Sequence, residues 1–328
     1  MKQNSGIWNI WLKFATITLC MCLATGNAWA NDDGNRWFQI KTSLFGDKNI
    51  LSGDEILGLE SPARAMDAAI VPIAIDSKIE QTPDHYIKSL YLVIDNNPSP
   101  VAAVFRFPGK HSWETLSTRV RINAYTDLRA IAELSDGKLY MVNNYVKASG
   151  GCSAPSLKDP AAAAAQLGKI KFRLPEEFNH GDLVATQLLI KPPNNSGLQF
   201  DQVSRFYIPA DFIRTIEVTF NGEEVFTADT DISISEDPSI RFGFTPEETG
   251  ILEVHVKDSK GRSFSHSIDL TENSKGCFQK QCKVESACTS LSLATAFCDQ
   301  VEVLYMAFLP AAAICCRLNS VEMCTYSS

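Results

Sequence analysis

The chain has 328 residues, and we expect two domains because single hydrophobic cores stop growing near about 250–300 residues. Apolar residues make up 45% of the chain and charged residues 21%, a composition that supports packed cores and excludes wholesale disorder. The net charge of -8 argues against a nucleic-acid partner, since an acidic protein repels phosphate backbones.

Residues 1–30 have the pattern of a secretory signal peptide. Lys2 supplies the positive start, residues 14–24 form an apolar core, and the tripeptide 28–30 (AWA) provides small residues for cleavage. The core is shorter than the ~20 residues that a membrane span needs, which disfavours the alternative of an uncleaved anchor. We therefore expect export, cleavage near Ala30, and no membrane attachment of the mature protein.

Residues 54–147 are expected to form a run of short strands separated by turn-forming residues. Asp136-Gly137 between two apolar segments is a strong hairpin pattern. Strands at this spacing are typical of an antiparallel sandwich. The expected strands are Ala69–Ile75, Leu90–Ile94, Val101–Phe107, Ser117–Ala124, Asp127–Glu133 and Lys138–Val146.

Residues 148–168 differ in composition from the strand-rich segment before them. The segment 148–158 (ASGGCSAPSLK) is small, polar and without a hydrophobic period, which indicates a flexible loop. A short helix is predicted after it, with Asp159 as its cap, Pro160 at its first position and Gly168 at its end.

Residues 169–270 form a second expected strand set, and Asn221-Gly222 predicts a tight type I′ hairpin within it. The expected strands are Ile170–Leu174, Leu183–Ile190, Thr215–Phe220, Glu224–Ala228, Ser239–Thr245, Gly250–Lys257 and Ser263–Ile268. The fold class is therefore all-β, with two antiparallel β-sandwiches joined by a flexible Gly-Gly-Cys loop and a short helix.

Residues 274–328 have no clear strand or helix period and contain seven of the ten cysteines. No CxxC pair or common zinc spacing occurs among them. Three interpretations stay open: disulfides within the tail, pairing with Cys152, or an atypical extension such as one from an altered reading frame.

Cys152 is the residue that points most directly to chemistry, because no other cysteine lies between the signal peptide and position 277. Gly150 and Gly151 precede it, and glycine lets a backbone pass a narrow opening or adopt positive φ. A thiol on such a tether, in its thiolate form, is a nucleophile that reaches another protein's cleft. The alternative is an incidental exposed loop cysteine.

No catalytic or metal-binding pattern accompanies this cysteine. The five histidines lack the spacing that places two ligands on one face, and no nucleophile elbow, phosphate loop or dinucleotide fingerprint occurs. We therefore expect no catalytic site, no metal and no cofactor apart from a covalent adduct on Cys152.

Residues 54–152 resemble SoxY, the sulfur-bearing subunit of the sulfur-oxidation carrier. The matching stretches are Ile56–Ile75, Tyr91–Phe107, Thr118–Glu133 and the terminal Ser149-Gly150-Gly151-Cys152. Residues 169–270 resemble SoxZ, most specifically at Gly197–Ile213, Ser233–Phe242 and Gly250–Phe264. The order is similar to fused SoxYZ-like carriers associated with quinoprotein dehydrogenases.

This resemblance implies that both sandwiches are immunoglobulin-like. It also implies a periplasmic protein in which Cys152 is the covalent attachment point, with Gly150 and Gly151 as its flexible arm. It implies sulfur-oxidation-type enzymes as partners, or a quinoprotein dehydrogenase and its cytochrome. The expected domains are 31–152 (SoxY-like), 153–168 (linker), 169–273 (SoxZ-like) and 274–328 (tail). One departure is that the SoxY arm ends its chain as GGCGG, whereas Ser153-Ala154-Pro155 continues this one.

Three functional hypotheses follow. The first is a non-enzymatic carrier in which Cys152 bears a sulfur-containing or other thiol-reactive group and presents it to partner enzymes. The second is a docking or electron-transfer accessory module for a periplasmic quinoprotein (alcohol) dehydrogenase, with an incidental thiol. The third, which lacks a CxxC motif in its favour, is a redox protein that pairs Cys152 with a tail cysteine.

Overall fold

The structure is a computed structural model that describes residues 33–270, except 110–112, 156–164, 176–177, 180, 192 and 203. The expected signal peptide, the cysteine-rich tail and most of the expected helix at 159–168 lie outside these residues. The described chain is nearly all β, as the sequence predicted, with one helix, α2 (Asp33–Phe45). No helix in this part of the chain is long and apolar enough to cross a membrane.

The strands fall into two sequential sets. The first set is β1 (Ile50–Ser52), β2 (Leu57–Glu60), β3 (Val71–Ser77), β4 (Ile87–Ile94), β5 (Val101–Arg106), β6 (Thr115–Val120), β7 (Thr126–Leu134) and β8 (Leu139–Val146). The second set is β9 (Lys169–Arg173), β10 (Val184–Lys191), β11 (Phe200–Asp201), β12 (Phe206–Tyr207), β13 (Ile213–Phe220), β14 (Glu223–Thr230), β15 (Ser239–Phe244), β16 (Ile251–Asp258) and β17 (Ser263–Asp269).

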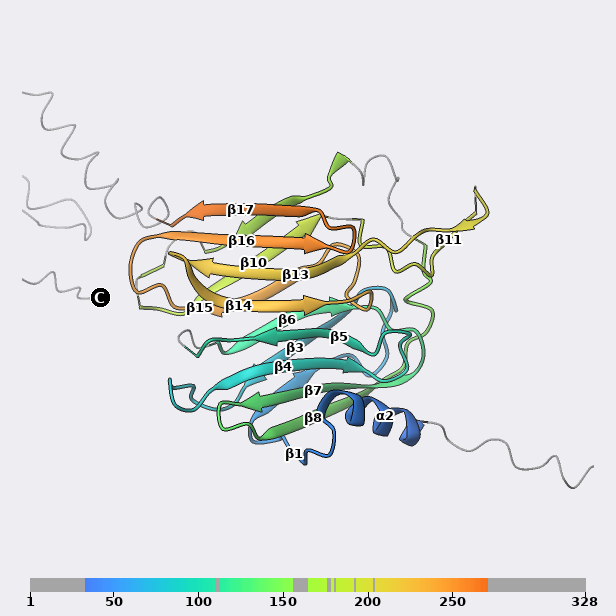
Figure 1. The fold of residues 1–328 in the computed structure, drawn as a ribbon, viewed down its shortest axis with the longest axis horizontal. Helices are drawn as coiled ribbons and strands as arrows, with labels where there is room; N and C mark the ends of the chain where they lie inside the picture. The colour runs from blue at the N-terminus through green and yellow to red at the C-terminus, as the bar shows by residue number, and fades with distance from the viewer. Residues whose placement is uncertain are drawn as a thin grey trace, which may run out of the picture. The chain divides into compact units, whose positions relative to one another are not determined.

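The two sets share their sheets. A nine-stranded sheet has the order β1-β8-β7-β4-β5-β14-β13-β16-β17, and a six-stranded sheet has the order β2-β3-β6-β15-β10-β9 (Figure 1). Strand β5 of the first half pairs with β14 of the second, and β6 pairs with β15, in both cases antiparallel. The halves are thus joined side by side through main-chain pairing, in addition to the loop that the sequence predicted.

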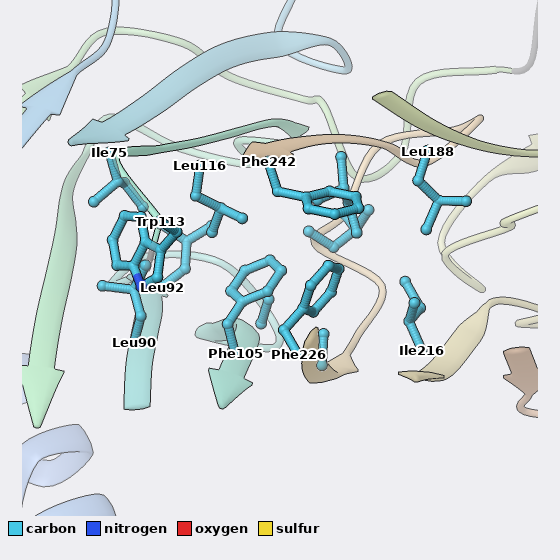
Figure 2. Packing of buried hydrophobic residues seen from close by; sticks show 14 of the residues in the cluster. Ile75, Leu90, Leu92, Phe105, Trp113, Leu116, Leu188, Ile216, Phe226 and Phe242 are labelled. Atoms are coloured by element: carbon cyan, nitrogen blue, oxygen red, sulfur yellow. The ribbon is translucent and has the colours of Figure 1, made fainter. Parts of the chain in front are cut away.

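One hydrophobic core runs between the two large sheets and through both halves. Figure 2 shows Phe105 of β5 beside Phe226 of β14, and their ring centroids lie 6.1 Å apart. Aromatic pairs at this spacing add to the stabilisation that burial of their area provides. The boundary between the halves is therefore packed like an interior, which makes the two sandwiches a single rigid base for the loop that follows β8.

The predicted strands and turns are confirmed to within a few residues. Gly137 has φ of 80° in the β7–β8 hairpin, and Asn221 and Gly222 have φ of 51° and 80° between β13 and β14, as a type I′ turn requires. Sequence inspection missed helix α2 and the four short strands β1, β2, β11 and β12. Each of these strands has only two to four residues, too few to show a period.

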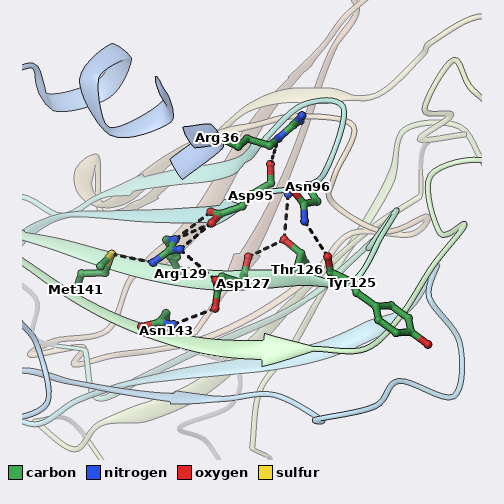
Figure 3. A network of polar contacts seen from close by, with 9 residues as sticks. All are labelled: Arg36, Asp95, Asn96, Tyr125, Thr126, Asp127, Arg129, Met141 and Asn143. Carbon is green, nitrogen blue, oxygen red and sulfur yellow. Dashed lines mark hydrogen bonds and ion pairs between the residues drawn. The ribbon is translucent and has the colours of Figure 1, made fainter. Parts of the chain in front are cut away.

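Helix α2 packs on the outer face of the nine-stranded sheet. Its Ile40 and Phe45 contact Val93, Ile131 and Leu139, which alternate along their strands with residues of the main core. The side chain of Arg36 donates to the main-chain carbonyl of Asp95, and Trp37 stacks on Arg129 at 4.3 Å. Figure 3 shows Arg129 at the centre of this network, with its guanidinium on the carboxylate of Asp95 at 2.8–3.0 Å.

Candidate functional site

Cys152 lies on the loop that follows β8, and its side chain is fully buried. It is the free cysteine of the described residues. The sequence predicted an exposed thiol on a flexible arm, and in this structure that expectation is wrong: the sulfur is enclosed at the boundary between the two halves. The reason is tertiary, because the walls around it come from segments far apart in the chain.

Main-chain hydrogen bonds hold the loop against both halves. The N–H groups of Gly150 and Gly151 donate to the carbonyls of Asn123 and Ile122, each at 2.9 Å. On the other side, the Ser196 hydroxyl donates to the Cys152 carbonyl, and Gln199 Nε2 donates to the Ala154 carbonyl at 3.1 Å. The loop is therefore docked between the two halves, with donors or acceptors from each.

The two glycines serve this docking in different ways, and their expected role as a flexible arm stays a prediction. A Cβ on Gly151 would lie 2.0 Å from the carbonyl oxygen of Ala68, so only glycine permits the close approach of the loop. Gly150 has φ of 80°, a left-handed conformation that glycine adopts at little cost, and a Cβ there would meet open space.

Arg121 is the charged residue beside this loop, and it is 1% exposed. Its guanidinium donates to three main-chain carbonyls of the second half: Ile232 at 3.1 Å, Ile234 at 2.7 Å and Asn194 at 2.8 Å. The sequence analysis missed Arg121. The available pattern was a charged residue between the apolar Val120 and Ile122, directly after strand β6.

Burial decides the protonation state of Cys152. Loss of solvent raises the pKa of the thiol to about 11, and the positive charge of Arg121 opposes this rise only in part. Burial also lowers the pKa of Arg121, although the charges of Cys152 and Glu236 act in the opposite direction. At neutral pH the docked sulfur is therefore a protonated thiol, which is a poor nucleophile.

A cavity of about 350 Å³ borders the docked loop. Ala154 and Pro155 form part of its wall, and Arg119 and Arg121 line it from the first half. Three carboxylates also line it, from Asp67, Glu236 and Asp237. This cavity gives the loop a partly polar, solvent-connected space beside Ala154 and Pro155.

In the described part of the chain, no three His, Cys, Asp or Glu side chains are arranged so that they could hold a metal ion. Histidines 85, 255 and 266 lie in this part, and histidines 111 and 180 lie outside it. His255 is 3.3 Å from Glu253 on the same strand, and His266 stacks on Phe172. These contacts assign the described histidines no part in the Cys152 site.

The solved structures that match this chain have low sequence identity to it and low TM-scores. A superoxide reductase (neelaredoxin) from Ignicoccus hospitalis is 13% identical, with 28% of this chain and 79% of that chain covered and a TM-score of 0.25. A β-glycosidase from Bacteroides vulgatus is 11% identical, with 66% and 25% covered and a TM-score of 0.21. Values this low carry no argument about function. No curated protein matches the chain.

Two family matches cover most of the described residues. Residues 41–152 match the sulfur oxidation protein SoxY, and residues 172–269 match the sulphur oxidation protein SoxZ. The SoxY match ends at Cys152, and the SoxZ match begins with the last residues of β9. The SoxY match covers the first half of the fold and the SoxZ match covers the second half. The chain therefore belongs to the fused SoxYZ-like proteins of the sulfur-oxidation carrier family.

Proposed function

We propose that this protein is a covalent carrier in which the Cys152 sulfur bears a sulfur-containing group and presents it to partner enzymes. The observation that carries the proposal is the position of Cys152. It is the last residue of the SoxY match, on a loop between two rigid halves, and it has no disulfide partner among the described residues.

The docked loop is the closed form of this carrier. Its hydrogen bonds to Ile122, Asn123, Ser196 and Gln199 each contribute about 0.5–1.5 kcal/mol net. Opening therefore costs about 2–6 kcal/mol, which corresponds to an open population of about 3% at most. In the open form the sulfur regains solvent, its pKa falls toward the ordinary cysteine value, and the thiolate becomes available to a partner.

Enclosure of the Cys152 sulfur protects it from oxidation in an oxidising compartment. A protonated, buried thiol reacts slowly with oxidants and with other thiols, because the thiolate is the reactive species. The proposal places the protein in the periplasm, where its partners are enzymes of sulfur oxidation. Neither the structure nor the family matches favour a quinoprotein dehydrogenase as partner.

Intact-mass spectrometry of the mature protein, purified from its host without reductant, tests this proposal. We expect an adduct on the peptide that contains Cys152, lost on reduction, and no adduct on a Cys152→Ser variant. The variant also removes sulfur-dependent turnover with the host's periplasmic fraction. A matched control is Ser153→Ala, which leaves the sulfur in place.

The competing interpretation is a structural cysteine that fills the space between the halves. It predicts an unmodified Cys152 in every preparation and a Cys152→Ser variant that is less stable but fully functional. That pair of results would contradict the carrier proposal.

A further inference from the structure

The two-stranded hairpin β11–β12 projects beyond the ends of the two large sheets (Figure 1). Its strands pair Phe200 with Tyr207 and Asp201 with Phe206. At its turn, the Arg205 N–H donates to the Asp201 carbonyl at 2.9 Å. The hairpin is therefore held by main-chain bonds of its own, although neither of its strands belongs to a large sheet.

Aromatic side chains are exposed on both faces of this hairpin. Phe206 and Tyr207 are 74% and 66% exposed, the highest values of any phenylalanine or tyrosine in the described chain, and Phe200 is 46% exposed. The rings of Phe200 and Tyr207 meet edge to face at 5.6 Å on one face, and Phe206 points to the other face because side chains alternate along a strand. A hairpin that packed on its own protein would bury one face. Exposed rings on both faces therefore indicate that another molecule covers them.

The base of the hairpin holds the Cys152 loop. Gln199, the residue before Phe200, donates through its Nε2 to the Ala154 carbonyl at 3.1 Å, and the Ser196 hydroxyl donates to the Cys152 carbonyl. The aromatic rings thus begin one residue away from a side chain that contacts the loop. An enzyme that reacts with the Cys152 sulfur has to approach this loop, and its surface then lies against the hairpin.

We propose that hairpin β11–β12 is the docking element for the enzyme that reacts with Cys152, and that its three aromatic rings insert into an apolar groove beside that enzyme's active-site entrance. The inference rests on the proposed carrier function and adds the surface by which the partner is recognised. Aromatic rings dominate the energy of many protein interfaces. Because the hairpin is already formed, its insertion avoids the ordering cost of a flexible segment.

Sulfur-dependent turnover with the host's periplasmic fraction, measured over a range of carrier concentrations, tests the docking. Phe206→Ser and Tyr207→Ser are each expected to raise the KM for the carrier about tenfold, because each removes a ring from the interface. The limiting rate should stay within about twofold of the parent's, since the reacting sulfur is unchanged. The reaction of Cys152 with iodoacetamide should also be unchanged, because the hydrogen bonds that hold the loop are kept.

The matched control is Ile251→Ser, which removes another exposed apolar side chain, 51% exposed, at the start of β16. Strand β13 follows the hairpin in the chain, and it begins at Ile213 and pairs with the start of β16 only at its far end, around Phe220. The control therefore lies away from the hairpin and should keep the parent's KM. An equal rise of KM in Ile251→Ser would overturn the proposal, as would faster iodoacetamide labelling that accounts for the effect of the hairpin variants.

The outcomes separate this inference from the carrier function. Parent-like KM values in both hairpin variants, with the parent turned over, would overturn the docking element and leave the carrier function intact. A parent that is neither turned over nor modified on Cys152 would overturn both. Thermal unfolding confirms that each variant is folded.

Two further measurements test other molecules that could cover the hairpin. Sedimentation velocity of the carrier alone reports a second copy of the chain, and flotation with phosphatidylglycerol vesicles reports a membrane surface. We expect neither self-association nor vesicle binding to depend on Phe206 or Tyr207. Loss of either in the variants, with turnover unchanged, would assign the rings to that other molecule and overturn the proposal.

Discussion

Two buried arginines of this protein, Arg129 and Arg121, are satisfied in opposite ways. Arg129 lies under helix α2, where Asp95 and Asp127 supply opposite charge and Trp37 stacks on its guanidinium. Arg121 lies at the boundary of the two halves and hydrogen-bonds only to main-chain carbonyls. The first arginine is neutralised within a structural network. The second keeps its charge available to the neighbouring Cys152 sulfur.

The comparison shows that the region around Arg129 attaches helix α2 to the sheet, whereas the region around Arg121 holds the Cys152 thiol. In the network under α2, every charge has its partner and the helix is fixed to the sheet. At the Cys152 loop, burial and Arg121 act on the thiol in opposite directions. A modest movement of the loop therefore raises the thiolate fraction of the sulfur, whereas the same movement of α2 would only separate a paired network.

The largest expected effect is that of Arg121→Met. This change removes the Arg121 donor from the carbonyls of Ile232, Ile234 and Asn194, of which Ile234 keeps a second donor in Asn194 Nδ2, at a cost of about 4 kcal/mol in the free energy of unfolding. Urea denaturation measures it. No substitution of a nearby acid should restore stability, because the partners are main-chain groups. Recovery on replacing Glu236 would show that Arg121 acts as an ion-pair partner, like Arg129.

Arg129→Met is expected to cost about 3 kcal/mol at pH 7, since it leaves the buried carboxylate of Asp95 without its cation. Burial already raises the pKa of Asp95, and loss of Arg129 raises it further. The variant's deficit should therefore shrink as the pH falls through the raised pKa of Asp95, where this carboxylate binds a proton. The double variant Arg129→Met/Asp95→Asn should recover most of the loss. A deficit independent of pH would contradict this account.

Gly151→Ala is expected to displace the Cys152 loop, because the added Cβ would meet the Ala68 carbonyl at 2.0 Å. We expect a loss of about 2–3 kcal/mol and at least a tenfold faster reaction of Cys152 with iodoacetamide at pH 7.5. Gly150→Ala is the control, since its Cβ meets nothing and only the positive φ is strained, at about 1 kcal/mol. Equal labelling rates in the two variants would show that Gly151 does not hold the loop closed.

The pH dependence of the free energy of unfolding should report the buried state of Cys152 directly. The pKa is raised from 9.0 to about 11 in the fold, so the unfolded chain loses its proton first as the pH rises. The contribution of Cys152 to stability is thus complete below pH 9 and is lost as the pH rises toward 11, by about 2 kcal/mol. Comparison of the parent with Cys152→Ser in denaturant at pH 8 and pH 10.5 measures it. An identical change in both proteins would contradict the assignment.

The smallest expected effect is that of Trp37→Leu, which removes the stacking of an aromatic ring on Arg129 but keeps an apolar side chain in α2. A loss of about 1 kcal/mol is expected in urea denaturation. In the Arg129→Met background the same substitution should cost less, because the cation is already absent. Equal costs in both backgrounds would show that only packing is involved.

Strand positions and hairpins could be predicted because short-range patterns carry them: alternating apolar residues in β4 and β13, and Asp-Gly or Asn-Gly at the turns. Helix α2 was missed, although Trp37, Ile40 and Leu44 recur at helical spacing. Cys152 was found from its isolation in the sequence, but its burial could not be. Burial depends on Ala68, Ile122 and Ser196, which nothing local to the loop identifies.

By itself the sequence determined the all-β class, the order of the two halves and the cysteine between them, because these depend on residue types at short spacing. Only the tertiary structure decided that the halves share sheets, that the thiol is enclosed, and that Arg121 lies beside it. The hydrogen bonds of Arg121 join residues 73 to 113 positions apart. Contacts at such separations arise from the pairing of β5 with β14 and β6 with β15, which local residue patterns do not specify.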